Sequence, residues 1–462
     1  MKHSTPGRSS RLGVVVFMYP LAGHLGSNRA PMTALALRED RFLDVLRRLI
    51  ALTPRLQNNP SAGMVPQERL AAQVVLDTLA PHIASGFIHA ESLASPGNES
   101  RPSLVLTVKG TGEGAVGFVG AHFDVVPADR QSEGWEHDPF TLWEGPDGLL
   151  YGRGVTDCLG HVAVATDLLA QLAETGTRPR RTLKVVLIAN EESSDLPGLG
   201  LGYVAEQGRL KDLSGQPVYW LDSANFGPTL GTGGISQWEL KVTGVGGHSG
   251  MPQNCVNALE LAMATSLELA RWFHAHYPPS EDEKRWGFLA TSSLKATVVE
   301  AANTKETKIP ADVTLRGDIR LTPFHDLAEV RRATEAFVRE LDARLERGDV
   351  PAGFPRTRTA DGKRGTLSFH FQGSGTEGIA CRLDSPGLHA LKDAMKAVRG
   401  VDAQPFSLTG SLPLVRDLQR QGCDVQITGF GEMKYYHAPN EQAHLGDFRQ
   451  GFSILRELLE RL

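Results

Sequence analysis

The sequence is poor in cysteine, in long apolar runs and in clustered basic residues. Among its 462 residues are four cysteines, Cys158, Cys255, Cys381 and Cys423, which lie far apart and form no CxxC pair. This spacing argues against a disulfide framework and a cysteine-rich zinc site, and it fits a reducing compartment. No apolar run reaches the ~20 residues that a membrane helix needs. The net charge is -5 and Lys and Arg are spread along the chain, so we expect neither a membrane nor a nucleic-acid partner.

The N-terminal stretch differs from the rest, because helical patterning begins only after Met32. Upstream, three basic residues precede an apolar run over residues 12–23, which is typical of a secretory signal. His24 and Arg29 lie between that run and the nearest cleavage-like site. We therefore expect residues 1–37 to be a disordered or extra N-terminal segment and the protein to be cytoplasmic, with secretion as the alternative.

A chain of this length is too long for one hydrophobic core, so we expect two domains. In residues 1–234, apolar strands alternate with helices, which predicts an α/β domain with a mostly parallel central sheet. Strands are expected at 104–108, 116–121, 182–189 and 218–221, and helices at 38–50, 68–79 and 161–175.

Residues 235–384 follow a different order, strand–helix–strand–strand–helix–strand. The elements are expected at 236–242, 254–277, 293–299, 312–321, 327–345 and 366–371. This is the order of a split βαβ, ferredoxin-like α+β domain. The pattern of the first domain resumes over residues 385–462, so the ferredoxin-like domain is predicted to be an insertion.

Side chains that could ligate a metal follow the strands of the first domain. They are His122 and Asp124, Asp157, Glu191 and Glu192, Asp222 and, late in the chain, His437. Each has an ordinary explanation on its own, since an Asp before a helix is usually an N-cap. Together they are expected in one crevice beyond the carboxyl ends of the strands. Carboxylates crowded there would repel one another, and a divalent cation removes that conflict. Two His with several carboxylates suit Zn²⁺, with Co²⁺ or Mn²⁺ as alternatives.

Five ligands suffice for two divalent ions if one carboxylate is shared, as in hydrolases whose metals lie about 3.5–4 Å apart. Asp157 is the expected bridge, because the glycines of its GRG segment allow a close backbone approach. His122 with Asp222 would complete one metal, and His437 with Glu192 the other.

Two carboxylates remain for catalysis. The His-x-Asp spacing puts His122 and Asp124 on the same side of the strand end, so Asp124 is expected to accept the second ring N–H of the histidine. Glu191 lies beside a ligand and points elsewhere. It is the expected general base, taking a proton from water and handing it to a leaving amine.

Four segments, GAHFDVVP, YGRGVTDCLGH, ANEESS and YYHAPNE, resemble the metal motifs of the dinuclear-zinc amidohydrolase superfamily. That superfamily includes acetylornithine deacetylases, succinyl-diaminopimelate desuccinylases, aminoacylases, carnosinase-like dipeptidases and glutamate carboxypeptidases. The DCLGH form of the Asp motif, and stretches such as GDIRLTPF and TGSLPLVRDLQRQGCDVQ, are closer to the acetylornithine deacetylase branch. The resemblance extends from about Asp40 to the C-terminus. It implies a zinc-exopeptidase-like catalytic domain with an inserted ferredoxin-like domain.

The resemblance also implies residue roles. The five ligands match the family's, with Asp157 as the bridge between two zinc ions and Glu191 as the base. His248, in GVGGHSGMP, matches the histidine that polarises the scissile carbonyl. In the family that histidine commonly reaches the neighbouring subunit's site, which implies a homodimer through the inserted domain. A donor aimed at the developing oxyanion can lower the barrier by about 2.7–4 kcal/mol.

The substrate-binding groups follow from the same resemblance. Arg320 and the backbone around Gly410 and Ser411 match groups that hold the substrate α-carboxylate, which a guanidinium can grip with two hydrogen bonds. Thr307 stands where relatives have a substrate-contacting asparagine, and Asn303 is the alternative for that role.

The predicted activity is removal of the acyl group from an N-acyl amino acid, in particular N-acetyl-L-ornithine in arginine biosynthesis. A dipeptidase or another N-acyl-amino-acid amidohydrolase would use the same centre. An inactive amino-acid or peptide binder is the alternative of another class, and the intact Glu191 argues against it.

Overall fold

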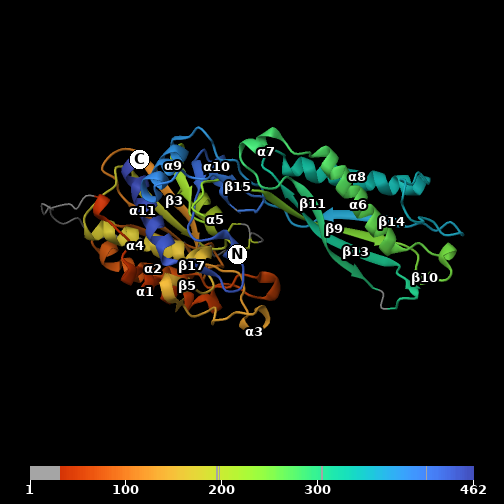
Figure 1. The fold of residues 1–462 in the computed structure, drawn as a ribbon, viewed down its shortest axis with the longest axis horizontal. Helices are drawn as coiled ribbons and strands as arrows, with labels where there is room; N and C mark the ends of the chain where they lie inside the picture. Colours follow the sequence, from red (N-terminus) through yellow and green to blue (C-terminus); the bar gives the residue numbers. More distant parts are fainter. Residues whose placement is uncertain (1–31, 194–195, 197, 303–304, 413) are drawn as a thin grey trace, which may run out of the picture.

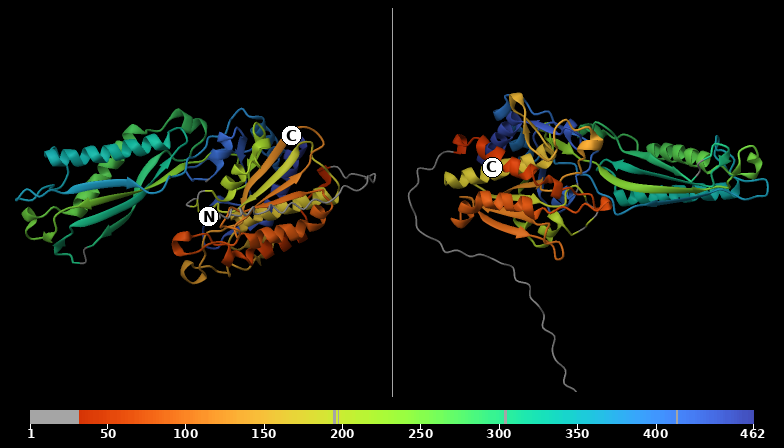
Figure 2. Two further views of the ribbon diagram at one scale, coloured as in Figure 1. Left: turned by 180° about the vertical axis from the view of Figure 1, so that it is seen from behind. Right: turned by 90° about the horizontal axis from the view of Figure 1, so that it is seen from below.

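The computed structural model describes residues 32–193, 196, 198–302, 305–412 and 414–462. Two bodies lie end to end, a larger one built from both ends of the chain and a smaller one from its middle (Figures 1 and 2). The apolar run at residues 12–23 lies outside the described residues. Residues 33–37 pack onto the larger body, where Leu35 is buried and its carbonyl oxygen accepts a hydrogen bond from Arg456.

An eight-stranded mixed sheet forms the centre of the larger body, in the order β1-β2-β6-β3-β7-β16-β8-β15. Four of its seven pairings are parallel, including all those of β3. The bounds are β1 His89–Leu93, β2 Ser103–Val108, β3 Ala115–His122, β6 Thr182–Ile188, β7 Pro217–Trp220, β8 Thr229–Gly231, β15 Phe406–Ser407 and β16 Asp424–Ile427. Every residue of β3 is buried, as expected for a central strand covered on both faces.

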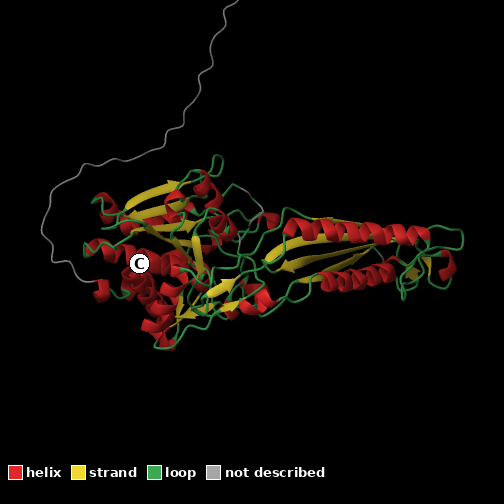
Figure 3. Ribbon diagram, turned by 90° about the horizontal axis from the view of Figure 1, so that it is seen from above, coloured by secondary structure: helices red, strands yellow, loops and turns green. Residues whose placement is uncertain are grey.

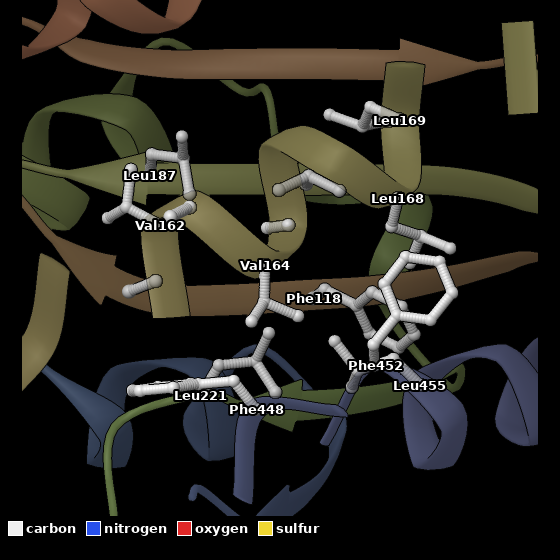
Figure 4. Packing of buried hydrophobic residues seen from close by; sticks show 14 of the residues in the cluster. Phe118, Val162, Val164, Leu168, Leu169, Leu187, Leu221, Phe448, Phe452 and Leu455 are labelled. Atoms are coloured by element: carbon white, nitrogen blue, oxygen red, sulfur yellow. The ribbon is translucent and has the colours of Figure 1, made fainter. Parts of the chain in front are cut away.

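Helices cover both faces of this sheet. One face packs against α1 (Glu39–Ile50), α2 (Arg69–Ala84), α4 (Gly160–Glu174), α9 (Pro386–Arg399) and α11 (Leu445–Arg461). The other packs against α5 (Gly200–Glu206) and α10 (Val415–Arg420). Figure 4 shows Val164 and Leu168 of α4 packed close to Phe118 of β3, with Phe448 and Phe452 of the neighbouring helix α11 nearby. Because both faces of α4 are covered, it is buried over nearly its whole length.

The smaller body is a four-stranded antiparallel sheet with two long helices along it (Figure 3). Its order is β11-β13-β9-β14, with β9 Gly234–Thr243, β11 Ser293–Ala301, β13 Asp312–Leu321 and β14 Thr366–Phe371. The helices are α6 (Ala258–His276) and α8 (Leu327–Arg347). Strand order and chain order together are those of the predicted ferredoxin-like unit. A two-stranded ribbon, β10 (Gly247–His248) and β12 (Lys308–Ile309), projects at the end far from the larger body (Figure 1).

The predicted α/β class with an inserted α+β unit is confirmed, but several short elements escaped prediction. They include β1, β8, β15 and β16, helices α3 (Arg130–Glu133), α7 (Glu281–Arg285) and α10, and the strands β4 (Trp143–Glu144) and β17 (Gln442–His444), which pair on either side of β5 (Leu149–Tyr151). The division at 234/235 and 384/385 stays a prediction. Ile379 and Cys381, just before the second boundary, pack in the core of the larger body.

Within the part of the chain that the structure describes, no helix combines the length and apolar character required to span a membrane.

Candidate metal centre

His122 is the last residue of β3, and its ring is oriented by the backbone two residues on. Its Nδ1–H donates to the carbonyl oxygen of Asp124 at 2.8 Å, so Nε2 points into the crevice. There Nε2 lies 3.0 Å from Oδ1 of Asp157 and 4.0 Å from Oδ2 of Asp222. The central strand therefore delivers a fully buried imidazole to two carboxylates from other strand ends.

Asp157 lies between two histidines. Its second oxygen, Oδ2, is 3.0 Å from Nε2 of His437, and that nitrogen is also 3.1 Å from Oε2 of Glu192. Asp157 is in the tight turn η5 (Val155–Leu159), which follows β5. Gly154, directly before this turn, has a φ of +91°, and a Cβ on Gly154 would come within 2.8 Å of the Leu159 side chain. The compactness expected of the GRG segment is present, and one carboxylate contacts both imidazoles.

Two buried carboxylate oxygens of this cluster lack a hydrogen-bond partner among the described residues. Oδ1 of Asp222 and Oε1 of Glu192 have no hydrogen bond among the described residues. A buried polar atom without a partner is costly, and a divalent cation would remove that cost for both. Ligand atoms of His122, Asp157 and Glu192 lie within 4.8 Å of one another, so the residues present fit a metal ion.

The charges of the carboxylates and imidazoles in this cluster influence one another. Burial, and then the charge of Asp157, raises the pKa values of Glu192 and Asp222 to about 7. Burial opposes a charge on His437, but its hydrogen bonds with Asp157 and Glu192 raise its pKa to about 11. Burial likewise opposes ionisation of Asp157, yet the two histidines lower its pKa. A divalent cation bound here would compensate the carboxylate charges and compete with protons for the same ligand atoms.

The carboxylate of Asp124 does not bind His122 in the way the sequence predicts. Its Oδ1 is 3.6 Å from Nδ1 of His122, too far for a hydrogen bond, and the ring donates to the backbone carbonyl of Asp124 instead. The two carboxylate oxygens accept the backbone N–H groups of Glu191 (3.1 Å) and Glu192 (3.0 Å) and the amide of Asn58 (2.7 Å). Asp124 therefore orients the Glu–Glu turn as well as contacting the histidine.

Glu191 follows β6 in a buried position beside the cluster. Burial, followed by the charge of Asp222, raises its pKa well above the ordinary value. A carboxylate in such surroundings binds a proton readily, which suits a group that must accept one from water. The cluster opens toward solvent at His437, whose side chain is 55% exposed.

His248 and Thr307 do not join the cluster. Both are at the β10–β12 ribbon, at the far end of the smaller body (Figure 1), where the carbonyl oxygen of Thr307 accepts the N–H of Ser249. The exposed His248 accepts the N–H of Gly250 at Nδ1 (3.0 Å), so the neutral ring carries its proton on Nε2. Asn303, the alternative to Thr307, lies outside the described residues.

Arg320 and Gly410 lie near the crossing between the two bodies. Arg320 pairs in register with Ile235 and contacts the carboxylate of Asp318 at 2.9 Å. Gly410 accepts the N–H of Gly233 at its carbonyl oxygen (2.8 Å), and Ser411 follows it in the same loop. Arg320 and Gly410 therefore both contact the short segment of residues 233–235, which brings them near each other.

Three features of the centre escaped the sequence analysis. The thiol of Cys158 lies with ligand atoms of His122 and Asp222 within 4.8 Å, although a lone cysteine in sequence carries no such signal. Asn58 is 66 residues from the Asp124 that it contacts. Glu441 is the last residue of the YYHAPNE segment that contains His437, but its burial and its partners could not be read from that position.

The chain belongs to a family of metal-dependent hydrolases. Residues 118–461 match the model of peptidase family M20/M25/M40, so the protein is a member of that family and a metal-dependent amidohydrolase.

Individual relatives of known name show which members of the family this chain is similar to. The chain is 38% identical to an acetylornithine deacetylase of Dictyostelium discoideum over 450 residues, covering 94% of this chain and 99% of that one. It is also 38% identical to an acetylornithine deacetylase of Arabidopsis thaliana, covering 92% and 96%. Among solved structures, the yeast di-peptidase Dug1p has a TM-score of 0.66 at 19% identity over 92% of this chain and 96% of that one, which supports the fold.

Proposed function

We propose that the protein hydrolyses N-acetyl-L-ornithine to ornithine and acetate. The observation that carries the proposal is the cluster in which Asp157 contacts both His122 and His437, with Glu191 buried beside it. The substrate is suggested by the two acetylornithine deacetylases, whose likeness to this chain extends over nearly its whole length.

The proposed metal centre would hold two divalent cations, with zinc as the expected metal. His122, Asp157 and Asp222 would bind one, and His437, Asp157 and Glu192 the other. Such ions lower the pKa of water and polarise a carbonyl or its developing oxyanion. This ligand set of imidazole and carboxylate would also accept Co²⁺ or Mn²⁺.

Glu191 is the proposed general base. Its carboxylate takes a proton from the attacking water and then delivers that proton to the nitrogen of the leaving ornithine amine. Asp124 keeps Glu191 in place by accepting its backbone N–H. Arg320 and the backbone at Gly410 and Ser411 are proposed to hold the substrate α-carboxylate.

The proposed oligomer is a homodimer joined through the smaller body, in which His248 from a second copy donates Nε2–H to the oxyanion, with Thr307 beside it. The distance of the β10–β12 ribbon from the cluster supports this arrangement. A further support is β11, one of the two edge strands of the sheet, where Val298 and Val299 are exposed. Met263 and Leu267 on the neighbouring α6 are exposed too. An unpaired edge with apolar neighbours favours strand-to-strand association.

The proposed location is the cytoplasm. All four cysteines are free and buried, which fits a reducing compartment.

The test is turnover of purified, zinc-loaded protein on N-acetyl-L-ornithine, with other N-acetyl amino acids and a set of dipeptides as competitors. Release of ornithine at a higher kcat/KM than any competitor is the expected result. Preferred cleavage of a dipeptide would contradict the proposed substrate and would identify the protein as a dipeptidase. Metal binding without turnover of any substrate would indicate an inactive binder.

A further inference from the structure

One buried carboxylate, Glu441, joins the loop of Asp157 to the loop of His437. Glu441 is four residues after His437 and directly before β17, which pairs with β5, the strand that leads into the Asp157 turn. The carbonyl oxygen of Glu441 accepts the N–H of Gly152, and the carbonyl oxygen of Gln442 accepts the hydroxyl of Thr156. The two ligand-bearing loops are therefore in contact through this segment.

The side chain of Glu441 is directed at the backbone of the bridging residue. Its Oε1 accepts the N–H groups of Thr156 (2.8 Å) and of Asp157 itself (3.0 Å). Its Oε2 accepts the N–H of Gly154 and the Nη1–H of Arg153, both at 2.9 Å. With no exposed surface, the carboxylate receives four donors, three of them backbone groups of the turn that carries Asp157.

Arg153 compensates the buried negative charge of Glu441. Its side chain is buried with Glu441, donates to the carbonyl oxygen of Pro127 and lies 5.1 Å from the Trp135 ring centre. A buried ion pair is weak evidence for stability, because desolvation offsets much of the attraction. The Arg153–Glu441 pair is better explained by the geometry that it imposes. It orients the turn that carries Asp157, and the Asp157 side chain must contact two histidines.

We propose that Glu441, held by Arg153, is a positioning residue that sets the backbone of Asp157 and thereby the affinity of the centre for divalent cations. Among the described residues, the side chain of Glu441 hydrogen-bonds to Arg153 and to backbone N–H groups and to no proposed ligand side chain. The inference rests on the metal centre of the proposed function and not on the identity of the substrate.

The test compares zinc affinity in wild type and in Glu441→Gln, measured on metal-free protein by competition with a chromophoric chelator. Glutamine has nearly the shape of glutamate, but its NH₂ group would face backbone donors and leave at least one of them unpaired. We expect the zinc affinity to fall about tenfold or more, as for other groups that orient ligands. The thermal midpoint in excess chelator should change no more than in the control.

The matched control is Asp424→Asn. Asp424 is also a buried carboxylate that accepts a backbone N–H, that of Gly387, but it contacts none of the proposed ligands. Its substitution should leave the zinc affinity unchanged. Wild-type zinc affinity in folded Glu441→Gln would overturn the proposal, as would an equal loss in Asp424→Asn.

Arg153→Lys keeps the experiment decisive if Glu441→Gln does not fold. Lysine retains the charge and loses the planar fork, so a smaller but measurable loss of zinc affinity is expected. Unchanged affinity in this folded variant would overturn the proposal. If wild type itself binds no divalent cation, the metal centre fails and Glu441 has no centre to position.

Discussion

The centre around Asp157 and the ribbon that carries His248 differ in how far one chain completes them. At the centre, buried side chains that follow four strands contact one another and the half-exposed His437 of a distant loop directly. At the ribbon, His248 is exposed, and its described partner is the backbone of its own turn. Several carboxylates can be kept close together only where a surrounding core fixes their positions. An exposed histidine on a two-residue strand can take part in a site only where a second molecule contacts it.

The largest expected effect comes from Glu191→Gln at the centre. Glutamine cannot take the water proton, so kcat should fall about 10²–10⁴-fold while zinc is still bound. Steady-state kinetics and metal analysis on the same preparation check this, with Glu346→Gln, on an exposed part of α8, as the control. Activity near that of wild type in the variant would remove Glu191 from the mechanism.

His248→Ala at the ribbon should lower kcat by about 10²–10³-fold, the usual cost of losing one oxyanion donor. Zinc content should be unchanged, because His248 is remote from the centre (Figure 1). His274→Ala, an exposed histidine on α6 of the same body, is the control.

Mixing the two inactive variants tests whether the ribbon serves a second copy. After subunit exchange, a Glu191→Gln/His248→Ala heterodimer contains one site with both groups intact, so part of the activity should return. If exchange is demonstrated and no activity returns, His248 does not act between copies.

A smaller effect is expected at the proposed dimer edge. The double change Met263→Glu and Leu267→Glu places two charges on an exposed apolar part of α6, so the dimer should dissociate to monomers in light scattering. Activity should fall with the dimer fraction. Val401→Glu, at an exposed site of the larger body, should leave both unchanged.

The smallest effect is on stability. Bound zinc at a hundred times its Kd stabilises the folded state by about 2.7 kcal/mol, so a chelator should lower the melting temperature. Differential scanning fluorimetry checks this, and the chelator should have no effect on Asp157→Ala. An equal shift in that variant would mean that the stabilising metal is bound elsewhere.

Much of the centre could be anticipated, because its residues come directly after recognisable strands. His122 and Glu192 follow apolar runs that could only be buried strands, and the carboxyl ends of neighbouring parallel strands meet at one edge of a sheet. For Asp124 the sequence predicts only part of the arrangement. Its spacing places it beside the histidine, but only the turn after β6 determines that its oxygens receive the N–H groups of Glu191 and Glu192.

Short elements and distant partners could not be anticipated. β8 and β15 have three and two residues, too few for a periodic pattern, and they are strands only because a neighbour pairs with them. Glu441 ends the YYHAPNE segment, but its hydrogen bonds to the backbone of the Asp157 turn join residues more than 280 positions apart, which no sequence pattern reports.

The sequence by itself determined the fold class, the inserted unit and the chemical nature of the centre, because apolar periodicity and the kinds of side chains at strand ends are local properties. Only the tertiary structure decided that Asp157 contacts two histidines, that Glu441 and Arg153 hold its turn, and that His248 lies far from the centre. Those facts depend on distances between residues remote in the chain, and such distances are set by how the whole core packs.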